Sequence, residues 1–431
     1  TQRLEAVTVT GKAAPVLDVD HADVGGLDMP LARTPQSVTV LGADLLAATA
    51  SSSLSQVIKL DASLADSYNT TGFIEGLSVR GFLLDQGNNF MRNGLPVSNY
   101  APIAMENKER IEVLKGVAGL QSGVSAPGGL VNFVTKTPQR DAFTTASMAA
   151  DGHGGSKVHL DSNTAWGAVG MRVNLAAEDM RTPFDRADGK REFASVALST
   201  LAAPGTKISA DLEYHHKKQP SVPGLGLLDA NGDGVGDTLP ASQYARLNLN
   251  NQSWSLPFES TSTNAQLAID HLINADWQAY LGLGTQRTVV HDRLAFPAGC
   301  SNATTYVYPG LCANGDVDLY DYRSENEERS TWAWDARLQG KLAAMGVQHR
   351  VRLSLSGRNA KTALNPTQAY NYVGSTNINT PAVLPGDGTA LDLNTNSRER
   401  AVDASASLVS DLSSNVQSFV GFRTSQLNRS S

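Results

Sequence analysis

The pattern of hydrophobic and polar positions changes near Pro138. From about residue 41 to Pro138, apolar residues at helical spacing, such as Leu54, Val57 and Ile58, are mixed with short strand-like runs, a combination typical of a small α/β unit. After Pro138 the chain alternates with period two, as in the segment 168–179, and such alternation predicts strands with one apolar and one polar face. The sequence therefore predicts two regions of different architecture.

We expect eleven strands in the second region. Their approximate bounds are 142–151, 155–164, 168–179, 191–201, 206–216, 262–272, 275–288, 331–343, 346–360, 399–411 and 415–428. Alternation alone fits a soluble β-sandwich as well as a membrane β-barrel. Short turns of three to five residues, however, alternate mostly with long connections, and this asymmetry favours an outer-membrane barrel. The long connections are 180–190, 217–261, 289–330 and 361–398.

Composition narrows the function classes. The formal net charge is −7 and no basic run stands out, which argues against a nucleic-acid partner. No stretch of 18 apolar residues is present, so no transmembrane helix is expected. The sequence has no Ser-His-Asp, CxxC or HExxH arrangement, and we therefore do not expect an enzyme.

The chain has two cysteines, Cys300 and Cys312, which flank a segment rich in Gly, Pro, Asn and Thr. Two cysteines this close in a turn-rich segment favour a disulfide-stapled loop in an oxidising compartment. In the chain-entropy model, closing a loop of ~15 residues stabilises a fold by roughly 3 kcal/mol. The alternative is two unrelated thiols.

Another loop carries a calcium-like pattern. Asp229, Asn231 and Asp233, followed by a glycine, match the start of an oxygen-ligand calcium loop. Asp237 adds a carboxylate, but the position of the expected bidentate Glu is occupied by Pro240. A calcium site is therefore one interpretation, and an ordinary turn-rich loop is the other.

Five motifs follow one another between Thr34 and Pro138: TPQSVTVLGADLL, LSVRGF, MRNGLPV, ERIEVLKG and GVSAPGGLVNFVTKTP. Together, in this order, they resemble the TonB-dependent receptors, in the ferric-siderophore branch, and the resemblance runs from about Glu5 to the end of the chain. It implies an α/β plug domain inside a transmembrane antiparallel β-barrel, with about 11 strands present here of a probable 22. A barrel edge left open in lipid would have unpaired backbone groups, so we expect only part of the barrel.

The resemblance also implies a domain organisation. We expect a TonB-box segment and linker at 1–33, a plug domain at 34–140, and a partial barrel with long extracellular loops at 141–431. The plug-motif residues are Arg80, Gly81, Arg110, Glu112, Lys115, Gly116, Pro127, Gly128, Gly129 and Asn132. Glycines allow tight turns and close backbone approach in a confined plug. The charged members are expected to form a network between plug and barrel wall, and the alternative is that they maintain the plug's own fold.

The N-terminal segment contains alternating β-formers that resemble a TonB box. Its residues are Glu5, Ala6, Val7, Thr8, Val9 and Thr10. An extended segment of this kind suits strand addition to the edge of a partner's sheet. The resemblance implies that the partner is a TonB-type energy-coupling protein of the inner membrane. A disordered tail or an ordinary edge strand would show the same pattern.

The resemblance places ligand-binding residues on the upper loops of the plug, near 66–75, 83–90 and 97–104. The candidates are Tyr68, Asn69, Gln86, Asn88, Asn89, Arg92 and Tyr100. Aromatic and amide groups suit a bulky polar ferric chelate, and an arginine suits an anionic one. Solvated loop residues of no special role are the alternative.

Together these features predict a receptor in the outer membrane of a Gram-negative bacterium, embedded in outer-membrane lipid. Its expected function is import of a ferric siderophore, energised through the TonB system, with the siderophore as ligand and no covalent cofactor. One alternative keeps the architecture but changes the cargo to a corrinoid or a carbohydrate. A passive porin-like channel is a third, against which the plug motifs and the EAVTVTG segment argue.

Overall fold

The computed structural model describes residues 21–23, 30–49, 51–304 and 306–431. The first region begins with η1 (Leu31–Arg33), β1 (Ser37–Gly42), α1 (Ala43–Ala48), α2 (Leu54–Ile58), β2 (Leu64–Tyr68), β3 (Gly76–Val79) and β4 (Phe82–Leu83). It continues with β5 (Phe90–Arg92), β6 (Leu95–Pro96), β7 (Lys108–Lys115), α3 (Gly119–Ser122) and β8 (Gly129–Thr135). Five of these strands form a mixed sheet in the order β1-β7-β8-β5-β6, and β2, β3 and β4 form a second sheet.

Local sequence explains why these short elements form. Ser53 caps α2, because its side chain accepts a hydrogen bond from the backbone of Gln56. The apolar residues of α2 are all buried and pack with the strands of the five-stranded sheet. The same core includes Ile111 and Val131 from the central strands β7 and β8. The first region therefore has a hydrophobic core of its own.

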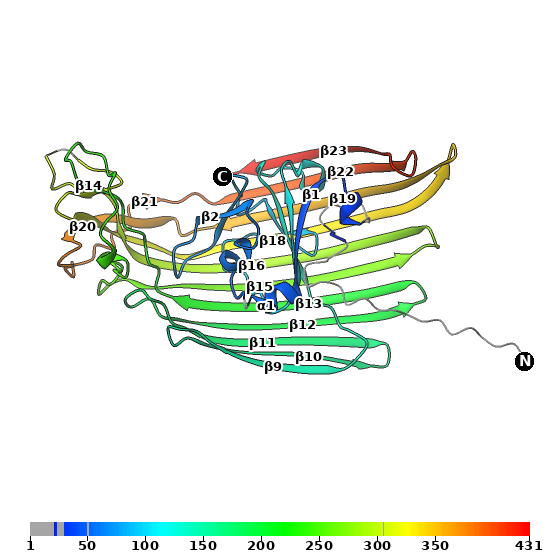
Figure 1. Cartoon of the computed structure of the whole chain (residues 1–431), viewed down its shortest axis with the longest axis horizontal. Coiled ribbons are helices and arrows are strands. Elements are labelled where there is room, and N and C mark those ends of the chain that lie inside the picture. The colour runs from blue at the N-terminus through cyan, green and yellow to red at the C-terminus, as the bar shows by residue number, and fades with distance from the viewer. Residues whose placement is uncertain (1–20, 24–29, 50, 305) are drawn as a thin grey trace, which may run out of the picture.

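The second region is one large antiparallel sheet of thirteen strands. Eleven of them pair in chain order: β9 (Phe143–Ala150), β10 (Ser156–Trp166), β11 (Val169–Met180), β12 (Gly189–Ala203), β13 (Thr206–Gln219), β15 (Leu256–Leu272), β16 (Trp277–Pro297), β18 (Asp316–Ala344), β19 (Val347–Ala363), β22 (Ser397–Asp411) and β23 (Gln417–Ser430). The sheet is strongly curved, and the first region lies against its concave face (Figure 1).

The strands near the long connections extend further than the sequence pattern predicts. β18 has 29 residues instead of the thirteen expected, and β16 continues to Pro297. The segment 361–398, expected as a loop, contains β20 (Thr367–Asn377) and β21 (Asp392–Leu393), and β20 pairs with β18. Period-two alternation is lost in these extensions because both faces carry polar residues there. Parts of these expected connections are therefore strand rather than loop.

In the large sheet, apolar side chains are exposed on one face and polar side chains are buried on the other, which is the reverse of a soluble sheet. Leucines such as Leu175, Leu212 and Leu355 remain between 43% and 49% exposed. Their polar neighbours Asn174 and Glu213 are almost completely buried, on the face that meets the first region. Apolar residues on the outside and polar residues on the inside are typical of a sheet that faces lipid. No described helix has the length and apolar character required to cross a membrane.

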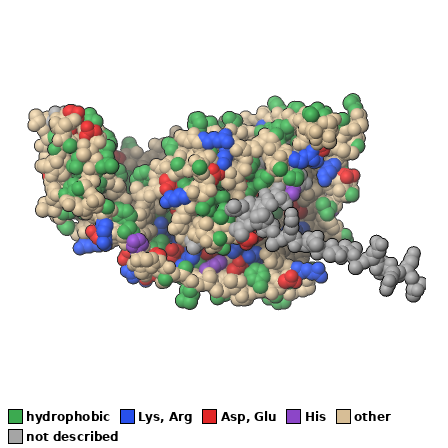
Figure 2. Space-filling view, in the orientation of Figure 1, with side chains coloured by type: hydrophobic (Ala, Val, Ile, Leu, Met, Phe, Trp, Pro, Cys, Tyr) green, Lys and Arg blue, Asp and Glu red, His purple; other side chains and the backbone are tan. Residues whose placement is uncertain are grey.

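The long connections form a small packed unit of their own, which we call the outer unit. It contains β14 (Leu228–Asp229), η2 (Ser242–Tyr244) and β17 (Leu311–Cys312), and β14 and β17 pair in parallel. Leu249, Leu311 and Leu319 belong to a buried apolar cluster within it. In the space-filling view this unit stands out as a knob at the end of the strands (Figure 2).

Candidate functional site

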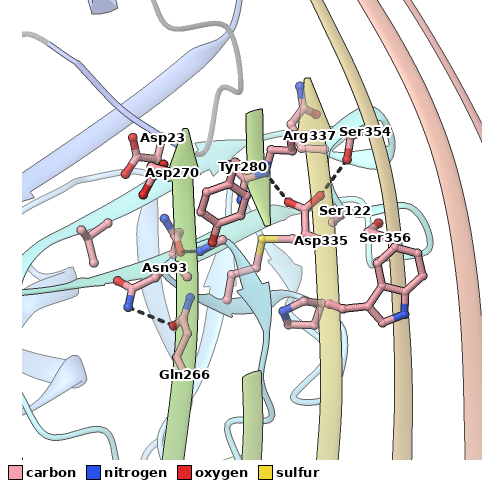
Figure 3. Close-up of a pocket in the computed structure, with 18 of the residues that line it drawn as sticks. Asp23, Asn93, Ser122, Gln266, Asp270, Tyr280, Asp335, Arg337, Ser354 and Ser356 are labelled. Atoms are coloured by element: carbon pink, nitrogen blue, oxygen red, sulfur yellow. Dashed lines mark hydrogen bonds and ion pairs between the residues drawn. The ribbon is translucent and has the colours of Figure 1, made fainter. Parts of the chain in front are cut away.

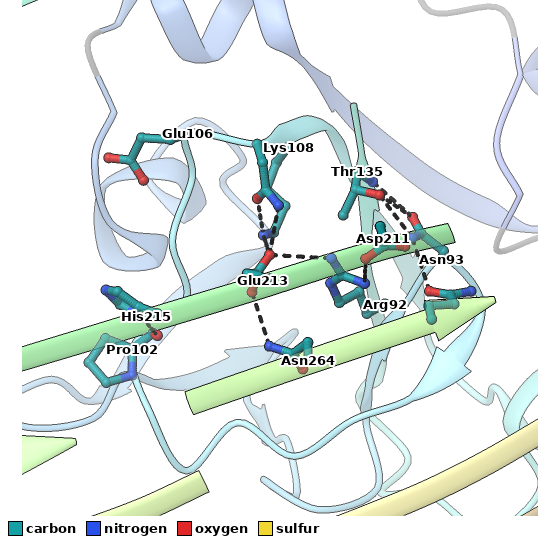
Figure 4. Close-up of polar contacts among 12 residues, drawn as sticks. Arg92, Asn93, Pro102, Glu106, Lys108, Thr135, Asp211, Glu213, His215 and Asn264 are labelled. Atoms are coloured by element: carbon teal, nitrogen blue, oxygen red, sulfur yellow. Dashed lines mark hydrogen bonds and ion pairs between the residues drawn. The ribbon is translucent and has the colours of Figure 1, made fainter. Parts of the chain in front are cut away.

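The first region is held to the large sheet by buried charged groups around Glu213 (Figure 4). The Glu213 carboxylate on β13 accepts hydrogen bonds from Lys108 at 2.9 Å, Asn107 at 2.7 Å and Asn264 at 3.0 Å. Arg92 adds an ion pair with Glu213 at 3.4 Å and another with Asp211. Burial lowers the pKa of Lys108, and the nearby Glu213 only partly offsets this. The cluster is a desolvated anchor between two distant parts of the chain.

A second anchor joins the same side of the first region to β12. Glu106 is 5% exposed. It accepts two hydrogen bonds from the guanidinium of Arg191, at 2.5 and 3.1 Å, and Glu178 also pairs with Arg191, at 2.7 Å. Burial raises the pKa of Glu106, but the bonds from Arg191 and its positive charge more than offset this and hold that pKa well below its usual range.

A third anchor lies further along the same side. Lys136 pairs with Asp161 of β10 at 2.9 Å, and Arg172 of β11 pairs with the same carboxylate at 2.8 Å. All three anchors connect the first region to strands β10 to β13. Sequence reasoning missed the residues of these anchors as a group, although the alternation along β13 does put Asp211 and Glu213 on the polar face.

The charged plug-motif residues have partners inside the first region. Lys115 pairs with Asp61 at 2.6 Å, and Arg80 donates to Ser37 at 2.9 Å. Arg110 pairs with Glu112 at 2.7 Å and with Asp23 at 2.6 Å. Asn132 donates to Glu112 across the neighbouring strands β7 and β8. The described contacts of these residues therefore lie within the first region, and they favour the alternative, in which the charged residues maintain the plug's own fold.

The glycine-rich stretch after β7 has a steric explanation. Gly129 has a φ of 143°, and a Cβ at this position would lie 2.1 Å from the carbonyl oxygen of Leu114. Only glycine therefore allows β8 to pair this closely with β7. Gly119, in contrast, has open space around it and an ordinary φ. The remaining plug-motif glycines are Gly81 and Gly116, both with positive φ, and Gly128, which lies close to Phe82; Pro127 precedes it.

Two of the expected ligand residues have structural roles instead. Arg92 is 5% exposed and is occupied by Asp211 and Glu213. Asn89 is completely buried, and its amide donates to the carbonyl oxygens of Ala126 and Gly129. Their expected ligand-binding role is therefore wrong, because neither side chain reaches an open surface.

The other expected ligand residues lie on loops of the first region. Tyr68 is 51% exposed, and burial and the Asp292 carboxylate raise its pKa. Tyr100 lies under the guanidinium of Arg329, 3.9 Å from the ring centre. The amides make local hydrogen bonds: Asn69 accepts from Gly76, Asn88 donates to Asp85 and Gln86 accepts from Asn99. The two tyrosines thus offer aromatic surface and hydroxyl groups near the inner wall.

The calcium-like loop is a hydrogen-bonded turn. Both carboxylate oxygens of Asp229 accept hydrogen bonds from backbone N–H groups, of Gly232 and Asp233 on one oxygen and of Gly234 on the other. Asn231 and Asp233 bond to each other, and Asp237 accepts from Thr238. Within the described residues no group of three or more His, Cys, Asp or Glu could hold a metal ion. The hydrogen bonds favour the other interpretation, an ordinary turn-rich loop.

The predicted disulfide is confirmed. Cys300 and Cys312 form a disulfide with Cα atoms 5.6 Å apart, and both are buried next to Val307 in the outer unit. The bond fixes the connection between β16 and β18.

Comparison with known proteins identifies the first region. The family described as TonB-dependent Receptor Plug Domain matches residues 30–130. Over these residues the chain is similar to the TonB-dependent receptors. The first region is its plug, and the large sheet around it is the wall.

Two relatives of this chain are named as receptors for metal chelates. The receptor is 32% identical over 192 residues to a protein of Pseudomonas aeruginosa (strain UCBPP-PA14), "Metal-pseudopaline receptor CntO", covering 38% of this chain and 27% of the relative. It is 25% identical over 338 residues to "Ferric-pyoverdine M114 receptor PbuA" of Pseudomonas sp. (strain M114), covering 75% and 38%. The chain thus spans well under half the length of both relatives.

Solved structures share the fold. The ferric preacinetobactin receptor BauA of Acinetobacter baumannii superposes with a TM-score of 0.79 at 19% identity, covering 93% of this chain and 59% of that one. The open form of the ferric-catecholate import receptor Fiu of E. coli K12 gives 0.78 at 16% identity, covering 96% and 62%. The expected TonB box, Glu5 to Thr10, lies outside the described residues.

Proposed function

We propose that this receptor lies in the outer membrane of a Gram-negative bacterium and imports a ferric siderophore. The plug match carries this proposal, because a plug that fills the concave face of a lipid-facing sheet suits regulated import rather than free diffusion. The names of the relatives support a ferric chelate as cargo. Exposed Tyr68 and the stacked pair of Tyr100 and Arg329 suit such a ligand, since aromatic and cationic groups bind bulky polar anions.

The energy source follows from the family rather than from a contact in the structure. We propose that Glu5 to Thr10 bind a TonB-type protein, and that 1–33, 34–140 and 141–431 act as coupling segment, plug and wall. The three anchors support a need for energy, because separating buried ion pairs from their partners costs about 3–5 kcal/mol for each pair that is broken. A passive channel would not need buried ion pairs that hold a plug in place.

A second cargo class has a specific observation in its favour. The relative at 32% identity is named for a metal–pseudopaline complex rather than for a ferric one. We therefore include a metal other than iron as the alternative cargo.

Uptake in cells tests both cargoes. The receptor is expressed at its natural length in cells that lack their own siderophore receptors, and binding is measured at low temperature before uptake in energised cells. We expect binding and energy-dependent uptake of at least one radiolabelled ferric chelate among catecholates, hydroxamates and pyoverdines. Uptake of a zinc–pseudopaline complex, with none of the ferric chelates taken up, would favour the second cargo. Quenching of the tryptophans, of which Trp254 lies in the outer unit, gives an independent measure of binding.

A further inference from the structure

Three positively charged residues lie close together on one face of β19 and β22. Lys361 of β19 and Arg398 of β22 are directly opposite each other in the pairing of the two strands, and Arg400 follows on the same face of β22. All three residues are exposed. Neighbouring strands lie ~4.8 Å apart, and residues two positions apart on a strand are roughly 6–7 Å apart. The three charges therefore form one patch, which we call the outer basic patch.

Alternation along β22 assigns this patch to the outer face of the sheet. Val402, the next residue of β22 on the side of Arg400, is 52% exposed. Asp403 has the opposite orientation, since it is buried and its carboxylate lies next to Gly123 of the plug. The patch is therefore on the face of the wall that also carries the exposed leucines, away from the plug.

The outer basic patch begins where the apolar part of this face ends. On β22 the exposed apolar side chains run from Leu408 to Val402, and Arg400 is the next residue on the same face. Arg400 also shares a row across the strands with Trp332 of β18, through Asn359 of β19. Trp332 is 49% exposed, and tryptophan is enriched at membrane–water interfaces. The patch therefore lies at the depth of lipid headgroups, on the side of the long connections.

Several cations on the inner face of the same part of the sheet are balanced by carboxylates of the protein. Arg337 pairs with Asp335, which also accepts a hydrogen bond from Ser354 (Figure 3). Arg423 pairs with Asp403 at 3.1 Å. These positive charges therefore have their counter-charges within the wall.

The outer basic patch has no carboxylate partner among the described residues. β22 has a described strand on each side, and the residues opposite Arg398 and Arg400 are Lys361, Asn359, Ser430 and Asn428. Arg398 donates a hydrogen bond to the amide oxygen of Asn359 at 2.9 Å, which leaves its charge unbalanced. Like charges directly opposite each other destabilise a sheet. An anion supplied from outside the protein would remove this repulsion.

We propose that the outer basic patch binds the phosphate groups of an anionic glycolipid in the outer leaflet of the membrane. Guanidinium groups bind phosphate oxygens through two parallel hydrogen bonds, and a lysine adds a compact positive charge. The exposed apolar side chains from Val402 to Leu408 lie where the acyl chains of the same lipid would pack. The inference rests on the outer-membrane location proposed above and adds a lipid partner to it.

A double substitution in the full receptor tests this site. Lys361→Gln with Arg398→Gln removes the directly opposed pair of charges. The matched control is Lys190→Gln with Lys218→Gln, because these two lysines are also exposed and directly opposite each other on the outer face. In the control pair, Lys218 has a carboxylate partner in Glu259, at 2.7 Å. Binding of diphosphorylated lipid A to the delipidated receptor in nonionic detergent is measured for each variant, with dephosphorylated lipid A and inorganic phosphate as comparison ligands.

We expect Lys361→Gln with Arg398→Gln to weaken binding of diphosphorylated lipid A at least about tenfold, because each cation near an anionic membrane surface strengthens binding severalfold. The control should change this affinity by less than about twofold, since Glu259 already balances charge there. Dephosphorylated lipid A should bind the unmodified receptor weakly. Equal affinities of the two double variants for diphosphorylated lipid A would overturn the site. Displacement of that lipid by an equal concentration of inorganic phosphate would overturn the lipid as the occupant.

Thermal unfolding in the same detergent separates lost binding from lost folding. Without lipid, Lys361→Gln with Arg398→Gln should unfold at the same temperature as the unmodified receptor or at a higher one, because a like-charge contact is removed. A lower unfolding temperature would contradict the proposed repulsion. These measurements do not depend on the cargo. Import of a ferric chelate without lipid binding at the patch would reject this inference alone, whereas lipid binding in a receptor that imports no chelate would support it and reject the proposed import.

Discussion

Removal of the Glu213 carboxylate should loosen the plug more than any other single change in the anchors. Glu213 accepts hydrogen bonds from Lys108, Asn107 and Asn264 and pairs with Arg92. After Glu213→Ala, Arg92 still has Asp211, but the ammonium group of Lys108, whose side chain is 1% exposed, loses its ion-pair partner. Breaking a buried pair in this way costs ~3–5 kcal/mol. Lys108 can limit the cost by releasing its proton, since burial already lowers its pKa.

This loss is measurable as plug release. The five tryptophans all lie in the second region, so their fluorescence follows the wall, and pulse proteolysis in urea can follow the plug in the same detergent-solubilised receptor. We expect the plug of Glu213→Ala to become cleavable at lower urea, with the population of released plug raised roughly 100- to 4,000-fold, since each 1.4 kcal/mol is a factor of ten. The tryptophan signal should change much less.

Two further variants control this measurement. Glu192→Ala removes an exposed carboxylate of the neighbouring strand β12 that has no ion pair among the described residues, and should change stability by at most ~0.5 kcal/mol. Adding Lys108→Met to Glu213→Ala removes the stranded charge and should restore part of the loss. If Glu213→Ala released its plug at the same urea concentration as Glu192→Ala, the anchor would not carry the energy assigned to it here.

Three other changes follow from contacts described above. The pKa of Glu106 lies below its ordinary value of 4.5 in the folded receptor, so its pairing with Arg191 should stabilise the plug above about pH 4.5 and lose this effect as the pH falls toward the folded pKa; Glu106→Gln should flatten the acid limb of plug release, and an unchanged acid limb would contradict this. Removal of the disulfide by Cys300→Ser and Cys312→Ser should destabilise the outer unit by ~2–4 kcal/mol, seen as faster proteolysis there with the wall intact; equal proteolysis rates would show that the staple is dispensable. Val7→Pro removes a backbone donor from the expected TonB box and should abolish uptake but not surface binding, and import at the original rate would exclude the segment as the coupling site.

Sequence patterns predicted those parts of the fold that depend on local alternation. Residues 168–179, for example, were expected as a strand and form β11, from Val169 to Met180. The disulfide was predictable because both cysteines lie in one turn-rich segment. The extensions of β16 and β18 were not predictable, since their residues lose the apolar face that lipid imposes further along the same strands.

The charged contacts could not be predicted because they depend on which distant residues meet. Arg92 looked like a ligand residue, but its partners Asp211 and Glu213 are more than one hundred positions away in the chain. Asp229 fitted a calcium loop by its spacing, and only the orientation of the backbone N–H groups shows that its oxygens are occupied. Motif spacing identifies which residues are chemically able to bind, whereas burial and hydrogen bonding decide whether they are free to do so.

The continuous strands beneath the outer unit affect how quickly and how selectively cargo is captured. Gln286 on β16 holds the plug residue Ser98, and β16 continues eleven residues beyond it to Pro297, a further ~36 Å at ~3.3 Å per residue. The outermost part of the receptor is thus carried on paired strands, stapled by a disulfide and packed around its own apolar core. A surface ordered in advance loses little conformational entropy when a chelate arrives. We therefore expect a chelate to contact the rigid outer unit first. The shape of that unit should select among chelates before any part of the plug moves.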